Sequence, residues 1–214
     1  MRLLLLSLVL TAIFAAAPTQ ADAKARHYRR PHLAGRAVFE KNLRADALPA
    51  PSGNLHIASL NAHEELKTNI FNSDGSYNND AIRDISHLLR CRRTGEERSV
   101  DPRLLTVLSH IYDHFGQRRI EILSGFRNQR NTESYHFKGA ATDIRILGVG
   151  IKTLRAFAES LDTGGMGIGL YPRSGFVHVD VRPLPSYRWV DWSRSQPNSP
   201  DKRPPRGWKK KLES

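Results

Sequence analysis

Apolar residues in the middle of the chain recur with the spacing of helices. Intervals of three and four residues predict helices over 79–90, 102–115 and 152–161. The second helix has a clear start, because Asp101 supplies a side-chain oxygen for the first backbone N–H groups and Pro102 fits the first helical position. Gly116 then ends its apolar face.

Shorter apolar runs predict strands. They cover residues 55–59, 120–123, 141–146, 167–171 and 176–182. In the last run three valines alternate with His178 and Asp180, so the valines would face the core and the two polar side chains would share the opposite face. Helices first and strands mostly later predict an α+β fold, with a small, mostly antiparallel sheet and helices packed on one side.

The first 23 residues have the pattern of a signal peptide. Arg2 is a short basic start, residues 3–17 are an apolar run too short for a comfortable transmembrane span, and Ala21–Ala23 matches the A-x-A cleavage pattern. An uncleaved N-terminal anchor is the alternative. We therefore expect an exported protein of the periplasm or cell envelope, with no transmembrane span after signal removal.

The rest of the chain divides by composition. Residues 24–52 are rich in Arg, Ala and Pro without a sustained period, which predicts a flexible basic lead-in. Residues 193–214 combine prolines with a run of lysines and predict a disordered basic tail. Residues 53–192 have the size of one domain.

The charge balance favours anionic partners. Among 214 residues, 33 are basic and 21 acidic, for a net charge of +12, and a single cysteine excludes an internal disulfide. Export argues against nucleic acid, so anionic envelope lipids or the carboxylates of cell-wall peptides are the expected contacts.

Two short segments carry metal-binding side chains. His136 and Asp143 lie seven residues apart around a glycine, and His178 lies on the last predicted strand. Two imidazoles and one carboxylate make a three-ligand zinc site that leaves a fourth position for water. On spacing alone the alternative is that these histidines are held by hydrogen bonds without a metal, which is the commoner arrangement for a buried histidine on a strand.

The same residues form a recognisable motif. Residues 134–143 read S-x-H-x-x-G-x-A-x-D and resemble the signature of the D-alanyl-D-alanine zinc peptidases, within the lysostaphin, D-Ala-D-Ala and hedgehog-type group. Residues 124–127 resemble the S-G-[YF]-R element that precedes it, and residues 176–180 resemble the closing metal strand. Over about residues 55–192 the chain most resembles the exported, MepK-like murein endopeptidase branch.

The resemblance implies a role for each matching residue. His136, Asp143 and His178 would bind one zinc ion in a hedgehog/D-Ala-D-Ala-peptidase-like fold, so that residues 53–192 would be a zinc peptidase domain. Arg127 would hold a substrate carboxylate or polarise the scissile carbonyl, and Ser134 would hydrogen-bond the substrate.

One position departs from the pattern. Many relatives place an acidic general base three residues before the last ligand, where this chain has Gly175. Asp180 is the candidate base instead. The alternatives are that it orients a ligand as a hydrogen-bond partner, or that it is the third ligand itself.

The expected function is therefore a zinc-dependent murein endopeptidase that cleaves the peptide cross-links of peptidoglycan, between diaminopimelate residues or from D-alanine to diaminopimelate. A D,D- or L,D-carboxypeptidase acting on stem peptides is the enzymatic alternative. A non-catalytic, zinc-containing wall-binding module is the other, favoured by the missing acid at Gly175.

Overall fold

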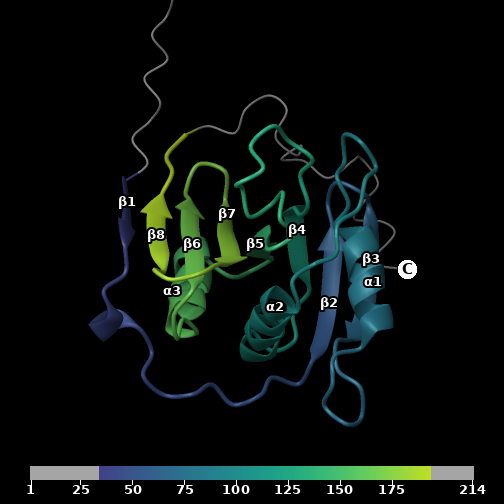
Figure 1. The fold of residues 1–214 in the computed structure, drawn as a ribbon, viewed down its shortest axis with the longest axis horizontal. Coiled ribbons are helices and arrows are strands. Elements are labelled where there is room, and N and C mark those ends of the chain that lie inside the picture. The colour runs from purple at the N-terminus through teal and green to yellow at the C-terminus, as the bar shows by residue number, and fades with distance from the viewer. Residues whose placement is uncertain (1–33, 194–214) are drawn as a thin grey trace, which may run out of the picture.

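An eight-stranded sheet runs through the part of the chain that the computed structural model describes, residues 34–193 (Figure 1). The strands lie in the order β1 (Ala34–Ala37), β8 (Tyr187–Val190), β6 (Met166–Tyr171), β7 (Phe176–Val181), β5 (Ala141–Ile146), β4 (Ile120–Ser124), β2 (Asn54–Ser59) and β3 (Glu64–Asn69). Strands β2 and β4 pair in parallel, as do β6 and β8, and the other pairs are antiparallel. The α+β class is confirmed, but the sheet is mixed and larger than the small, mostly antiparallel one expected.

Three strands, β1, β3 and β8, are not predicted from the sequence, because their pairing partners are remote or their side chains are polar. β3 carries two glutamates and a lysine along the edge of the sheet, which is how exposed edges are usually composed. β1 and β8 have four residues each and pair with one another.

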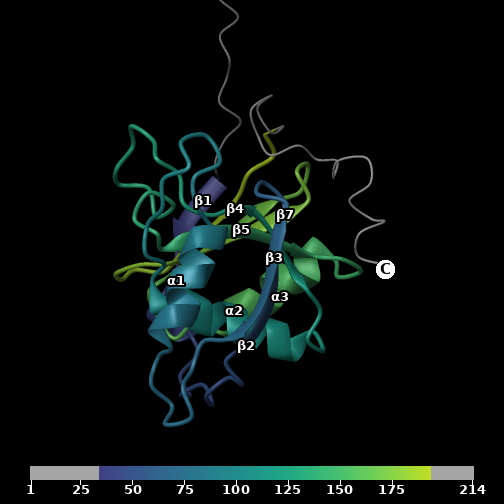
Figure 2. The same cartoon turned by 90° about the vertical axis from the view of Figure 1, so that its right-hand side faces the viewer.

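The three α-helices lie on one side of the sheet: α1 (Asn79–Leu88), α2 (Pro102–His114) and α3 (Ile151–Ser160) (Figure 2). α2 starts as predicted, because the Asp101 side chain accepts the Arg103 backbone N–H and Pro102 is the first helical residue. The Asn78 side chain caps α1 in the same way. Local capping chemistry therefore fixes both helix starts.

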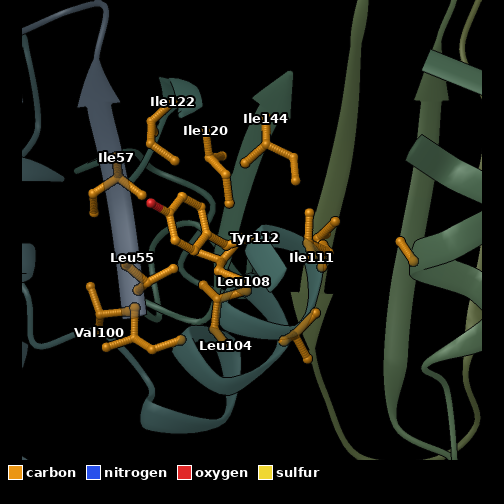
Figure 3. Packing of buried hydrophobic residues seen from close by; sticks show 14 of the residues in the cluster. Leu55, Ile57, Val100, Leu104, Leu108, Ile111, Tyr112, Ile120, Ile122 and Ile144 are labelled. Atoms are coloured by element: carbon orange, nitrogen blue, oxygen red, sulfur yellow. The ribbon is translucent and has the colours of Figure 1, made fainter. Parts of the chain in front are cut away.

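Figure 3 shows how the helix-covered face of the sheet forms the core. Leu104, Leu108 and Ile111 of α2 are fully buried in the same cluster as apolar residues of β2, β4 and β5. Val177, Val179 and Val181 of β7 belong to this cluster as well. Alternation along β7 therefore sends His178 and Asp180 to the sheet face opposite the helices, as the sequence predicts.

The terminal segments expected from composition fall largely outside the described residues. The signal peptide over 1–23 lies there entirely, as does the basic tail from residue 194 onward. The lead-in expected over 24–52 contains β1 and a short 3-10 helix at Glu40–Asn42, so residues 34–37 belong to the sheet. Within residues 34–193, no helix combines the length and apolarity needed to cross a bilayer.

Candidate metal centre

The loop that joins β4 to β5, residues 125–140, carries the first predicted ligand. It leaves β4 at an irregular register between Ile122 and Ser124, a kind of distortion common beside active sites. At its start, the Phe126 N–H donates to the carbonyl of Leu89, next to the end of α1. At its end, the Asp101 N–H donates to the carbonyl of Gly139. The loop is thus tied down at both ends.

Glycine at the end of this loop is required by geometry. Gly139 has a φ of +71°, and a Cβ atom there would overlap the carbonyl oxygen of Ser99. The backbone can then turn directly into β5, which carries Asp143 two residues after the buried Ala141. This explains why the motif combines a loop histidine with a strand carboxylate.

His136, Asp143 and His178 meet on the face of the sheet opposite the helices, and all three are buried. Asp143 and His178 are direct cross-strand partners in β5 and β7. The His136 Nε2 atom lies 3.1 Å from His178 Nδ1 and 3.4 Å from Asp143 Oδ1, and His178 Nδ1 lies 2.9 Å from Asp143 Oδ1. One potential ligand atom from each residue therefore points to a common centre.

The outer nitrogens of both imidazoles are occupied. His136 Nδ1 lies 2.8 Å from the carbonyl oxygen of Gly125, which can only accept, so this nitrogen carries a hydrogen. His178 Nε2 lies 2.9 Å from the carboxylate of Asp180 and donates to it. In the neutral imidazoles the inner nitrogens, His136 Nε2 and His178 Nδ1, therefore carry no hydrogen and each has a free lone pair. Together with Asp143 Oδ1 they form a triangle of three acceptor atoms.

Such a triangle needs a positive charge at its centre. A tetrahedral zinc ion with ligand distances of about 2.0–2.1 Å sets its ligand atoms about 3.3 Å apart, and the three separations found here, 2.9 to 3.4 Å, bracket that value. Nitrogen and carboxylate oxygen are also the donors that zinc takes. The residues present therefore fit a zinc ion with one open position.

The ionisation of the site agrees with this fit. Burial raises the pKa of Asp143, but the two neighbouring imidazoles outweigh it and hold the pKa well below its usual range, so the carboxylate is charged. Burial lowers the pKa of His136. Burial also lowers the pKa of His178, but the hydrogen bonds with Asp143 and Asp180 outweigh it, so this imidazole holds a proton more readily than usual. A metal ion would replace that proton.

Asp180 lies behind His178, away from the three acceptors. Its side chain is fully buried, and both carboxylate oxygens are engaged: Oδ2 with His178, and Oδ1 with Nε of Arg182 at 2.6 Å. Arg182 makes a second hydrogen bond to Oδ2. Burial raises the pKa of Asp180, but the bonds from Arg182 and His178 lower it overall. Asp180 therefore lies outside the cluster of potential ligand atoms, and its ionised carboxylate accepts a hydrogen bond from His178.

Two glycines of β6 make room for this arrangement. Gly167 lies opposite Asp180 and Gly169 opposite His178 in the β6–β7 register. A Cβ atom at Gly167 would overlap Asp180 and Arg182, and one at Gly169 would overlap the indole of Trp189. The Trp189 ring can thus approach His178, at 5.0 Å between ring centroids.

The two predicted substrate-binding residues lie in the β4–β5 loop. Arg127 is exposed, and its backbone N–H donates to the carbonyl of His136 at 3.3 Å. Its charge is one of the minor influences that lower the pKa of His136, after burial. Ser134 is half-buried two residues before His136. Arg127 therefore lies next to His136, whereas Ser134 is linked to it only through the sequence, and the contacts of both with a substrate stay predictions.

Three residues next to the centre, Arg182, Trp189 and Tyr171, are not predicted from the sequence. Arg182 follows His178 and Asp180 at the same alternating spacing, so the strand pattern could have found it. Tyr171 continues the face of Gly167 and Gly169, and its hydroxyl accepts the Trp189 Nε1–H at 3.2 Å. Burial raises the pKa of Tyr171 to about 12, so its hydroxyl keeps its proton at neutral pH.

The chain is similar to proteins of known description. The family model described as peptidoglycan L,D-endopeptidase MepK matches residues 49–187. The peptidoglycan L,D-endopeptidase MepK of Escherichia coli (strain K12) is 32% identical over 142 residues, covering 60% of this chain and 76% of that protein. The probable peptidoglycan L,D-endopeptidase MepK of Haemophilus influenzae is 33% identical over 123 residues, covering 51% and 65%. Among solved structures there is no significant match.

Proposed function

Because the chain belongs to the peptidoglycan L,D-endopeptidase MepK family, we propose that it hydrolyses the peptide cross-links of peptidoglycan at a zinc centre formed by His136, Asp143 and His178. The observation that carries this proposal is the triangle of three acceptor atoms on the face of the sheet opposite the helices. A bound zinc ion supplies activation of the attacking water and polarisation of the scissile carbonyl.

The chain's own residues hold the ligands in position. Gly125 fixes the tautomer of His136 through its carbonyl, and Asp180 fixes that of His178. Among the roles that the sequence leaves open for Asp180, this geometry favours orientation of His178 over direct proton transfer, because both of its oxygens are already engaged. Arg127 and Ser134 are assigned to the substrate, Arg127 through its exposed guanidinium.

The relatives' printed descriptions name an L,D-endopeptidase, so the bond we propose is an L,D cross-link. Cleavage from D-alanine to diaminopimelate and carboxypeptidase action on free stems are the enzymatic alternatives. We also propose export to the periplasm or cell envelope, which the apolar run near the N-terminus supports. Electrostatic contact with anionic lipids stays a prediction from the net charge of +12.

A second candidate is a wall-binding module that keeps its metal without catalysis. One observation favours it: Asp143 Oδ1 is part of the ligand triangle, and both oxygens of Asp180 are bound to His178 and Arg182, so Asp180 is not free to accept a proton. Gly175 stands where many relatives of the wider group have an acid. The two candidates differ in turnover and agree in zinc content.

The deciding experiment is digestion of isolated murein sacculi with the purified chain, with and without a chelator, followed by chromatography of the muropeptides. Chelator-sensitive loss of cross-linked dimers supports the endopeptidase, and the dimers lost identify the bond. Shortened stems with intact dimers indicate a carboxypeptidase. Intact muropeptides from protein that contains one zinc per chain indicate the binding module. His136→Ala should lose both zinc and activity. Arg118→Gln should lose neither, because Arg118 is an exposed residue before β4, near Gly148.

A further inference from the structure

The arginines of the described chain fall into two groups. Of seventeen arginines in residues 34–193, eight have a carboxylate within 4.0 Å and nine have none. Five of the nine unpaired arginines lie on two neighbouring loops beside the metal centre. We call these five the arginine rim: Arg92, Arg93, Arg98, Arg127 and Arg130.

The two loops of the arginine rim are packed against each other. Arg93 donates to the carbonyl of Asn128 at 2.6 Å, and the Asn128 side chain donates to Glu96. The second loop is the one that carries His136, and the Arg127 N–H donates to the carbonyl of that ligand. The arginine rim is therefore part of the metal-bearing surface.

Arg98 is held in place without a carboxylate. Its guanidinium lies over the ring of Phe137 at 4.6 Å and over that of Phe126 at 5.3 Å. Phe137 directly follows the ligand His136, and Phe126 begins the same loop. Residue 98 is nevertheless exposed. A guanidinium that is ordered, exposed and unpaired is prepared to bind an anion at little entropic cost.

The acids in these loops do not neutralise the arginine rim. Residues 90–98 and 125–138 contain seven arginines and lysines and only three carboxylates. Each carboxylate is already engaged: Glu97 pairs with His87, Glu133 with Lys138, and Glu96 with Asn128. The surface beside the centre therefore presents an excess of free positive charge.

We propose that the arginine rim binds the free carboxylates of the stem peptides on either side of the scissile bond, and so selects anionic peptides as substrate. This inference rests on the proposed function, because it assigns the rim to the substrate of that site. Position favours this partner over a lipid headgroup, since Arg127 and Arg130 share the loop that carries His136. The loop that carries Arg92, Arg93 and Arg98 is packed against it.

The test compares two substrates with the full chain. Purified cross-linked muropeptide dimers are used as they are, or after conversion of their free carboxylates to amides. The variants are Arg92→Gln/Arg98→Gln/Arg130→Gln, which spares Arg127, and Arg98→Lys alone, with Arg118→Gln as a matched control outside the rim. Zinc content and circular dichroism report whether each variant folds and keeps its metal.

On the unmodified dimer, the triple variant should raise KM about tenfold or more with kcat within twofold, since each exposed pair contributes up to about fivefold. Arg98→Lys should raise KM less, and Arg118→Gln should leave it unchanged. On the amidated dimer, the wild type and the triple variant should have the same KM. Equal KM values for wild type and triple variant on the unmodified dimer would overturn the proposal, as would the same rise in KM on both substrates.

A failure of the proposed function is distinguishable from a failure of the rim. If the zinc-loaded wild type cleaves neither dimer, calorimetric binding of the unmodified dimer is measured with the same variants. Binding that weakens at least tenfold in the triple variant supports the arginine rim even without turnover. Absence of binding by the wild type overturns it. If the triple variant binds vesicles containing an anionic lipid at least tenfold more weakly than the wild type but binds the dimer equally well, the rim is assigned to membranes and the proposal is overturned.

Discussion

His178 and Asp180 lie two residues apart on β7, and the Nε2 atom of His178 donates to the buried carboxylate of Asp180 at 2.9 Å. The opposite ring nitrogen, Nδ1, faces Asp143 and His136. A carboxylate behind a histidine ligand fixes the ring orientation and raises the basicity of the ligating nitrogen. The two residues thus have different positions: His178 presents a ring nitrogen to the cluster, and Asp180 holds the orientation of that ring from behind.

Asp180→Asn should weaken zinc binding about 10- to 100-fold, the usual effect of losing such a partner. Its activity should recover substantially when zinc is added in excess, because the amide removes an orienting charge and leaves the ligand triangle intact. Competition with a chromophoric chelator measures the affinity, and muropeptide release measures activity. Unchanged zinc affinity combined with lost activity would show instead that Asp180 is the proton acceptor.

Arg182→Met tests the next contact outward. The methionine keeps an apolar stem against Tyr135, whose ring lies 4.6 Å from the guanidinium, but removes the charge that neutralises Asp180. We expect zinc affinity to fall by about tenfold or less, and Arg182→Lys to restore part of it. Because both residues act through His178, adding Arg182→Met to Asp180→Asn should weaken zinc binding little further. If the losses of zinc affinity in the two single variants add fully in the double variant, the two residues do not act through the same contact with His178.

Gly169→Ala should destabilise the protein by about 1–3 kcal/mol, because the added Cβ overlaps the indole of Trp189 and forces it to move. Zinc affinity should fall with it, since the Trp189 ring lies against His178. Denaturant unfolding followed by tryptophan fluorescence gives the free energy. Gly150→Ala is the comparison: its Cβ would meet only Thr153, at 3.6 Å, in ordinary contact, so only the smaller cost of alanine at the N-cap of α3 is expected. Equal free energies of unfolding for the two variants would show that the sheet accommodates the added methyl group at position 169 without loss of stability.

Asp101→Ala should lower the free energy of unfolding by about 1 kcal/mol at neutral pH through loss of the cap of α2. Burial raises the pKa of Asp101, but its bonds with Arg103 outweigh this and lower it below the usual value. The ionised form therefore stabilises the fold above the unfolded pKa of about 3.9, and this contribution is lost as the pH falls through the lower folded value.

The difference between wild type and Asp101→Ala should accordingly narrow below about pH 4. Asp84→Ala, an exposed change on α1, is the control and should stay within about 0.5 kcal/mol of the wild type at every pH. A difference that persists unchanged into acid would contradict the role given to the ionised carboxylate.

Features encoded by neighbouring residues were predictable from the sequence. The start of α2 follows from Asp101 and Pro102, and the two faces of β7 follow from its alternation. The same alternation, together with the family signature, brought His178 together with Asp143. The family comparison confirms the resemblance on which that grouping rested.

Features that depend on distant pairing were not predictable. β1 and β8 contact each other across some 150 residues of chain, and neither has a strong pattern of its own. Trp189 approaches His178 only because β6, which separates their strands, has a glycine at position 169. The role of Asp180 could not be read from spacing, because it depends on which of its oxygens are already bound.

The pairing of β1 with β8 also has a mechanical consequence. Ala34 lies opposite Val190 and Ala37 opposite Tyr187, so the two ends of the described chain leave the sheet side by side, at the same edge. Tension applied between those ends would open the backbone hydrogen bonds of this pair one after another, as a zip opens, instead of loading them together in shear. β7 and β5, which carry His178 and Asp143, lie two and three strands further in from β8. Under such tension the sheet would open first at this edge, while the strands that carry His178 and Asp143 stay paired.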